Sequence, residues 1–221
     1  LGLLTTCAVL MSMSYTMLIP FLPMYLIQDL GVVKADVDMW SGAIFAITFL
    51  VSGIMAPIWG ALADKKSRKL MALRAGFCLA ITYFLGGLVT NPWELLGVRF
   101  IQGLSAGLWP ALLAIISVES PKLKLGFCMG VMQGGMTAGG VLGPLFGGLL
   151  ADQFGMRMAF FIAAAALFLI TLALLFFVKE EPRKPDPNAK PVKIWDFSLC
   201  KIPAVKRMLI CAGVVQLTIL M

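Results

Sequence analysis

Long apolar stretches alternate with short polar ones along the whole chain. A membrane-spanning helix needs about 20 mainly apolar residues to cross about 30 Å of hydrocarbon. Six stretches meet this length and a seventh begins near the end of the chain. The predicted spans are Leu1–Ile27, Trp40–Ala63, Leu70–Val89, Trp93–Val118, Leu125–Leu150, Met158–Val178 and the segment from Met208 onward. The pattern predicts an all-α membrane protein.

The segments between the predicted spans are short and polar, with one exception. The predicted loops on one side of the membrane are residues 28–39, 90–92 and 151–157. Those on the other side are residues 60–69 and 119–124. The exception is the segment 179–207, which is rich in Pro, Lys and Asp and predicts a cytoplasmic linker. We therefore expect a six-helix bundle at 1–178, a linker at 179–207 and a truncated seventh helix at 208–221.

Positive charges are distributed unevenly between the two sides of this predicted membrane. Lys and Arg in short loops stay on the cytoplasmic side during insertion. Fifteen of the 18 Lys and Arg fall on one side, only Lys34 and Arg157 fall on the other, and Arg99 lies within the fourth span. The odd-numbered spans are therefore expected to start in the cytoplasm.

One short sequence occurs twice. Residues 60–69 read GALADKKSRK, and residues 148–157 read GLLADQFGMR. The copies begin 88 residues apart and follow the second and the fifth predicted span. Internal duplication of this kind is typical of transporter folds.

Composition and charge exclude several classes of protein. Hydrophobic residues make up 60% of the chain and charged residues 13%, which is not the balance of a soluble domain. The net charge of +7 comes from loops between apolar spans, so we expect no nucleic-acid partner. The chain has five cysteines without a C-x-x-C pair and no histidine, which predicts reduced thiols and no metal site. It also has no phosphate-binding G-x-x-x-x-G-K-[ST] loop, so ATP hydrolysis is not expected.

Three motifs, each in the matching span and in the right order, resemble those of the major facilitator superfamily. Residues 60–69 resemble its charged signature between helices 2 and 3, with Gly60, Asp64 and Arg68 in place. The fourth span carries the helix 4 motif as Leu95, Arg99, Gln102, Gly103 and Ala106. The fifth span matches the helix 5 motif of the proton-coupled drug exporters at Gly130, Gly139, Gly143, Pro144, Gly147 and Gly148.

The resemblance implies the N-terminal half, the linker and the start of the second half of a twelve-helix multidrug efflux protein. It implies two inverted three-helix repeats, a bacterial cytoplasmic membrane, a monomer, a small lipophilic or cationic substrate and the proton gradient as the energy source, with no cofactor. Two positions depart from the family pattern. Ser67 stands where the loop usually has glycine, and the first span lacks the acidic residue that many drug exporters carry there.

The resemblance gives roles to the charged residues of the first two motifs. Asp64 and Arg68 are expected to form a cytoplasmic latch with the other half, whereas the remaining cations of that loop need do no more than set topology. Arg99 lies about 9 Å into its span and is expected to face the protein interior, since a cation is costly in lipid. It is expected to tune the protonation of a carboxylate. That carboxylate is either Glu94 or a residue outside this chain.

Glycines of the fifth span form a stripe. Gly135, Gly139, Gly143 and Gly147 recur every four residues, so a second helix can approach closely along this face. Pro144 removes one backbone hydrogen bond and permits a bend. A static packing seam explains the glycines equally well. The resemblance favours a seam that contacts the other half of the transporter during the transport cycle.

Aromatic and methionine side chains near the middle of the spans are candidates for a drug cavity, although such residues more often face lipid or core. These candidates are Tyr15, Phe45, Phe49, Trp109, Met132 and Met136. Methionine packs adaptably and aromatic rings can stack on a cation. We predict a proton-coupled exporter of lipophilic drugs rather than an enzyme. The rival hypotheses are a proton-coupled uptake symporter for a sugar or metabolite, and a sensor on the same fold that transports nothing.

Overall fold

The computed structural model describes residues 2–65 and 67–178, and this part of the chain is helical without a strand. Its elements are α1 (Gly2–Thr16), α2 (Leu22–Gln28), α3 (Val37–Lys65), α4 (Arg68–Leu88), α5 (Pro92–Leu104), α6 (Leu108–Glu119), the 3-10 turn η1 (Lys122–Lys124), α7 (Leu125–Phe154) and α8 (Met156–Phe177). The predicted linker and the predicted seventh helix lie outside the described residues.

Five stretches are long and apolar enough to cross a membrane. They are Val37–Ala63, Arg68–Leu88, Pro92–Val118, Leu125–Phe154 and Met156–Phe177. These stretches coincide with the second to sixth predicted spans, within a few residues at each end. Their number and length support a multi-pass membrane protein.

The first predicted span is not one continuous helix. Helix α1 ends at Thr16, and turns separate it from α2. With 15 residues, α1 is about 22 Å long and does not by itself cross about 30 Å of hydrocarbon. Pro20 accounts for the break, because proline has no N–H to donate and clashes with the preceding turn. Pro23 then lies in the first turn of α2, where a missing N–H does no harm.

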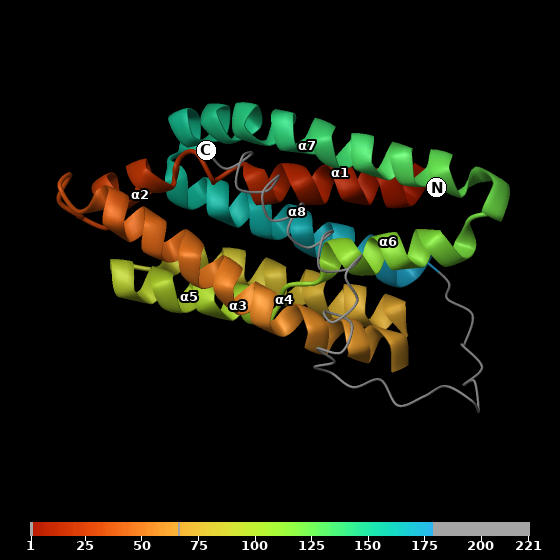
Figure 1. The fold of residues 1–221 in the computed structure, drawn as a ribbon. Helices are drawn as coiled ribbons and strands as arrows, with labels where there is room; N and C mark the ends of the chain where they lie inside the picture. The colour runs from red at the N-terminus through yellow and green to blue at the C-terminus, as the bar shows by residue number, and fades with distance from the viewer. Residues whose placement is uncertain (1, 66, 179–221) are drawn as a thin grey trace, which may run out of the picture. The chain divides into compact units, whose positions relative to one another are not determined.

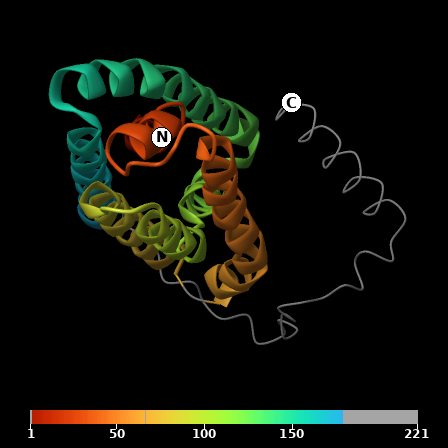
Figure 2. The same ribbon diagram turned by 90° about the vertical axis from the view of Figure 1, so that its left-hand side faces the viewer.

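The helices pack as two related triplets. Helices α1, α3 and α4 come from the first half of the described chain, and α5/α6, α7 and α8 come from the second. The main contacts run between the triplets. The first helix of each triplet packs on the second helix of the other, α1 on α7 and α5 on α3, and the two third helices, α4 and α8, pack on each other. Figures 1 and 2 show α1 lying alongside α7 and α8. This exchange is the packing expected of two inverted three-helix repeats.

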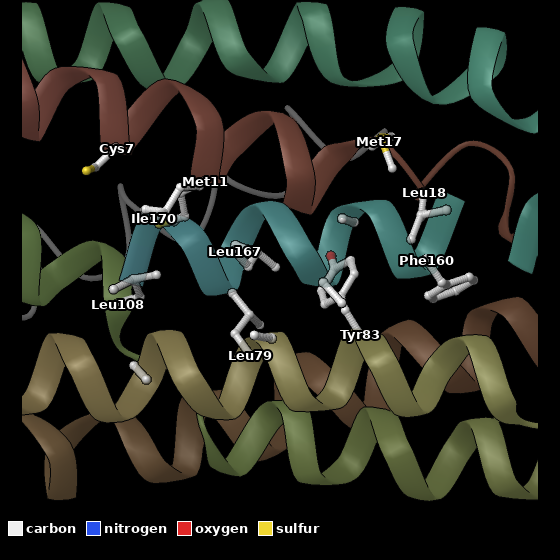
Figure 3. Close-up of a cluster of buried hydrophobic side chains, with 14 of the residues drawn as sticks. Cys7, Met11, Met17, Leu18, Leu79, Tyr83, Leu108, Phe160, Leu167 and Ile170 are labelled. Carbon is white, nitrogen blue, oxygen red and sulfur yellow. The ribbon is translucent and has the colours of Figure 1, made fainter. Parts of the chain in front are cut away.

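The core lies where α1, α4 and α8 meet (Figure 3). Helix α8 runs between the other two and presents Phe160, Leu167 and Ile170 to them, all of them buried. The ring of Tyr83 on α4 is also buried there and lies 6.2 Å from that of Phe160. One turn further along the same face of α4, a glycine permits close approach, because a Cβ at Gly86 would lie 2.9 Å from the Phe160 ring. These contacts fix the third and sixth spans against each other.

The turns between the helices are tighter than the sequence predicts. Residues 60–65 continue α3 and Arg68 already begins α4, so only positions 66 and 67 separate the two helices. Ser67 caps α4: its side chain accepts a hydrogen bond from the Leu70 N–H at 3.1 Å. The predicted loop 151–157 is likewise helical except at Gly155, whose φ of 82° favours glycine. Ser67 therefore works as a helix cap where the family has glycine.

Candidate functional site

A buried cation lies inside the bundle. Arg99 on α5 is 7% exposed, and its guanidinium donates to the Gln102 Oε1 at 3.0 Å. Gln102 is 4% exposed, and its Nε2 has no hydrogen-bond partner in the described part of the chain. The prediction that Arg99 faces the interior is confirmed. Its partner there is a neutral amide.

Hydroxyl groups from neighbouring helices surround this pair. The Tyr83 hydroxyl of α4 donates to the Tyr15 carbonyl of α1 at 3.1 Å and interacts electrostatically with Arg99 and Gln102. Thr48 of α3 is buried and donates to the Ile44 carbonyl at 2.8 Å, with the Arg99 carbonyl 3.4 Å away. We call Tyr15, Tyr83, Arg99 and Gln102 the buried polar cluster. It joins three helices around one positive charge.

Glu94 does not take part in this cluster. Its carboxylate accepts from the Thr90 N–H and from the Asn91 side chain, both at 2.8 Å, and Asn91 in turn caps the Glu94 N–H. This reciprocal arrangement is a capping box at the start of α5. Within residues 2–65 and 67–178, no salt bridge joins Glu94 to Arg99. The alternative in which Glu94 serves Arg99 is therefore not supported by the geometry.

The glycine stripe of α7 lies against α1. A Cβ at Gly135 would lie 3.1 Å from Thr5, and one at Gly139, Gly143 or Gly147 would meet the backbone of α1 or of the turn that follows it. All four are buried. Within this bundle the partner of the stripe is the first span, and a contact with the other half during the transport cycle stays a prediction. Gly130, by contrast, has no neighbour within 4 Å among the described residues, and Gly148 faces Phe21.

Hydroxyl side chains of α1 complete this seam. Ser12 donates to the Met136 carbonyl at 2.6 Å, and the Thr16 hydroxyl lies 3.4 Å from the Gly139 carbonyl. These bonds satisfy polar groups between helices where water is absent. Neither Ser12 nor Thr16 was among the residues predicted from the sequence. The signal was present in their spacing, because Thr5, Val9, Ser12 and Thr16 form a helical stripe of mostly small residues.

The same close approach recurs at the equivalent contact between α3 and α5. A Cβ at Gly103 would lie 2.8 Å from the Thr48 carbonyl and 2.9 Å from Val51. The helix 4 motif therefore combines a buried cation with a glycine contact at Gly103, one residue after Gln102 and four after Arg99. Close packing at Gly103 holds α5 where Arg99 reaches the cluster.

The six predicted cavity residues do not gather in one place. Met132 is fully buried next to Thr5, whereas Phe49 is 58% exposed. Phe45 and Trp109 pack against the core, and Met136 is half-buried. A small apolar hollow of about 150 Å³ lies between α1, α7 and α8, and other residues line it, among them Met13, Phe146 and Ile162. Of the six, only Tyr15 belongs to the buried polar cluster, and the fully buried Met132 belongs to the core.

At the end of the bundle that is predicted to be cytoplasmic, a lysine joins α4 to α8. Lys69 Nζ donates to the Leu175 carbonyl at 2.7 Å, in the last turn of α8. A cation there also interacts favourably with the helix dipole. Lys69, which the sequence assigned to topology alone, thus ties two helix ends together. The side chain of Asp64 lies outside the described residues.

The opposite end carries an ion pair. Arg157 Nε lies 3.3 Å from an Asp29 carboxylate oxygen, and its guanidinium donates to the Val89 carbonyl at 3.4 Å. All three residues lie at the end of the bundle that the charge pattern predicts to be external. We expect Arg157→Ala to lower the free energy of unfolding by about 0.5–1 kcal/mol, because the pair is partly exposed and screened. Thermal unfolding in detergent measures this effect.

A charge swap controls this prediction. Asp29→Arg with Arg157→Asp restores opposite charges, so the double variant should be more stable than either single one. If the single variants match the wild-type protein, the pair contributes nothing to stability.

The family model described as Major Facilitator Superfamily matches residues 4–220. The chain belongs to this family. A six-span bundle of two inverted repeats, with a cation in the fourth span and a glycine seam in the fifth, is the N-terminal bundle of a major facilitator protein.

Bacterial relatives of this major facilitator chain carry the name "Multidrug resistance protein MdtG". Identity is 44% over 168 residues with the protein of Citrobacter koseri, 42% over 169 residues with that of Yersinia enterocolitica and 43% over 168 residues with that of Salmonella paratyphi A. Each match covers 76% of this chain and 41% of the relative. The chain thus spans about two-fifths of the length of the curated relatives it matches.

Solved structures show the same fold. The chain resembles the crystal structure of the human organic anion transporter MFSD10 (TETRAN), with a TM-score of 0.64 at 22% identity over 78% of this chain and 46% of that one. It also resembles the POT family transporter PepTSo, with a TM-score of 0.71 at 14% identity over 84% of this chain and 39% of that one. At these identities the likeness concerns the fold alone.

Proposed function

We propose that this major facilitator chain belongs to a transporter that exports lipophilic compounds in exchange for protons across the bacterial cytoplasmic membrane. The observation that carries the proposal is the buried polar cluster, in which Arg99 is paired with the neutral Gln102. A buried cation without a carboxylate is costly in a membrane protein and is typically retained for function. The bacterial relatives named for multidrug resistance support the drug substrate.

Proton exchange needs a group that gains and loses a proton beside this cation. Arg99 favours the deprotonated form of any carboxylate brought near it, and so releases the proton on one side of the cycle. Within the described residues, α1, α4 and α8 carry no acidic residue, and Asp38 and Asp64 lie at the two ends of α3. We therefore place the proton-carrying carboxylate in the part of the transporter beyond this bundle.

Alternating access needs a second bundle, and two helices of this one have faces for it. In α3 and in α7, only 17% of the most apolar 18-residue stretch is buried, against 39% to 56% in the other spans. Exposed side chains on these helices include Phe49, Leu50, Val141 and Leu145. We assign part of these faces to the second bundle. Rocking against it would expose the buried polar cluster to alternate sides.

The experiment that tests this function measures dye accumulation in cells. Cells expressing the full-length protein should retain less of several fluorescent lipophilic dyes than cells without it, and a protonophore should abolish the difference. Uptake symport predicts more accumulation of its substrate rather than less. A sensor that transports nothing predicts no difference for any dye, with or without the protonophore.

The cytoplasmic latch gives a second test. Asp64→Asn should reduce dye export while the protein still inserts, because a carboxylate at a helix N-terminus contributes about 0.3–1 kcal/mol to one conformation. Asp64→Glu keeps the charge and serves as the matched control. Export at the wild-type level by Asp64→Asn, at equal protein abundance, would remove the latch role.

A further inference from the structure

The fourth span is broken one turn after the buried polar cluster. Helix α5 ends at Leu104 and α6 begins at Leu108. Gly107 has a φ of 125°, which other residues rarely adopt. The break has a second cause in the sequence, since the helical donor to the Ala106 carbonyl would be Pro110, which has no N–H. The prediction of one continuous helix from Trp93 to Val118 is therefore wrong.

Such a break leaves carbonyl groups without helical partners inside the membrane. Two side chains from other helices supply the missing donors. Trp59 Nε1 of α3 donates to the Leu104 carbonyl at 2.8 Å, and the Arg74 guanidinium of α4 donates to the Ala106 carbonyl at 3.2 Å. A broken membrane helix persists only where its freed backbone groups are satisfied in this way.

The two donors also hold each other. The Arg74 guanidinium carbon lies 3.3 Å from the centre of the Trp59 ring, which is cation–π geometry. A cation near a membrane helix end normally extends toward water. Arg74 instead bends onto the break, and its Nε is buried with no hydrogen-bond partner in the described residues. The guanidinium of the half-buried Arg74 thus contacts both the ring and the carbonyl.

We propose that Trp59 and Arg74 are positioning residues, which hold the break in the fourth span and through it set the place of Arg99 and Gln102. We call them the Trp59–Arg74 clamp. Gln102 lies two residues before the clamped Leu104 carbonyl, so a shift of that carbonyl moves the cluster directly. This inference rests on the proposed function, because it gives the clamp a task in proton coupling.

A labelling experiment tests whether the clamp holds the break. Ser105 is 8% exposed, so Ser105→Cys in a background with the five native cysteines replaced by alanine should react slowly with a membrane-permeant maleimide. Trp59→Phe keeps the ring beneath Arg74 and removes only the N–H donor. It should accelerate labelling about tenfold, the effect of losing one hydrogen bond. Arg74→Gln should do the same.

The matched control is Trp93→Phe. Trp93 lies at the other end of α5 and is 71% exposed, so its replacement should leave the labelling rate unchanged. Wild-type labelling rates in both Trp59→Phe and Arg74→Gln would overturn the clamp. So would equal acceleration by the control.

A double-mutant cycle on dye export tests whether the clamp acts through the cluster. Arg74→Gln should slow protonophore-sensitive export about tenfold in the wild-type protein, but less than about twofold in an Arg99→Lys protein, which keeps part of the export but lacks the guanidinium. It should also shift the pH dependence of export, which a loss of packing alone would not do. Equal losses in both backgrounds, with the pH profile unmoved, would make the clamp merely structural.

The two proposals fail in different ways. If the wild-type protein exports no dye, the proposed function is wrong, and the labelling rates still decide whether the clamp holds the break. If wild-type export is proton-coupled and Arg74→Gln leaves it unchanged, the clamp is wrong and the function stands.

Discussion

Gly143→Ala is expected to abolish export and to prevent stable folding of the bundle. A Cβ at this position would lie 2.6 Å from the Met13 carbonyl oxygen and 3.1 Å from the Met17 nitrogen. Both are backbone atoms, which cannot turn aside as a side chain can. Overpacking against side chains already costs about 1–3 kcal/mol, and contact with fixed backbone should cost at least as much.

Gly134→Ala is the matched control for this prediction. Gly134 belongs to the same helix, and nothing in the described part of the chain lies within 4 Å of its Cβ position. Alanine should therefore be tolerated there, and its helix propensity favours it over glycine by about 1 kcal/mol. Thermal unfolding in detergent and dye export should separate the two variants. Equal stability of Gly143→Ala and the wild-type protein would remove the seam between α1 and α7.

Arg99→Met is expected to eliminate proton-driven export without loss of stability. Methionine has a similar length, packs adaptably and removes a buried positive charge whose described partner is a neutral amide. The melting temperature should stay the same or rise. Gradient-driven export should fall by at least about tenfold, because a charged hydrogen bond is lost. A residue with only a structural role would show the opposite result, a loss of stability with export retained.

Arg99→Lys provides the control for charge. Lysine keeps a positive charge but lacks the planar group that donates to Gln102 and lies near Tyr83, so it should restore only part of the export. Full export by Arg99→Met, measured at equal abundance in the same vesicles, would contradict a role in coupling.

Hydropathy was sufficient to predict most of the spans. The second to sixth spans lie within a few residues of their predicted bounds, because a helix needs a set length of apolar residues to cross the hydrocarbon of the membrane. Breaks within spans were harder to predict. Pro20 and Pro110 are visible in the sequence, yet a proline in a membrane helix often causes only a bend. The Trp59 and Arg74 side chains decide the outcome at the second break, and they come from distant parts of the sequence.

The candidate site was predicted in part, for a similar reason. The cost of a charge in lipid predicts that Arg99 points inward, but not that its neighbours there are Gln102 and Tyr83. The four-residue spacing of the stripe at Gly135 predicts close helix packing, but not which helix packs there. Partners follow from the tertiary arrangement of the two triplets, which no local pattern encodes.

Proton-coupled export is tested most directly in inside-out vesicles that contain the full-length protein. The lumen of such vesicles corresponds to the cell exterior, so an acidic lumen should drive a fluorescent lipophilic dye inward as protons leave. Collapsing the pH gradient should stop this uptake, and Arg99→Met vesicles should show almost none. Dye that leaves the lumen together with the protons, or that ignores the gradient altogether, would contradict the account.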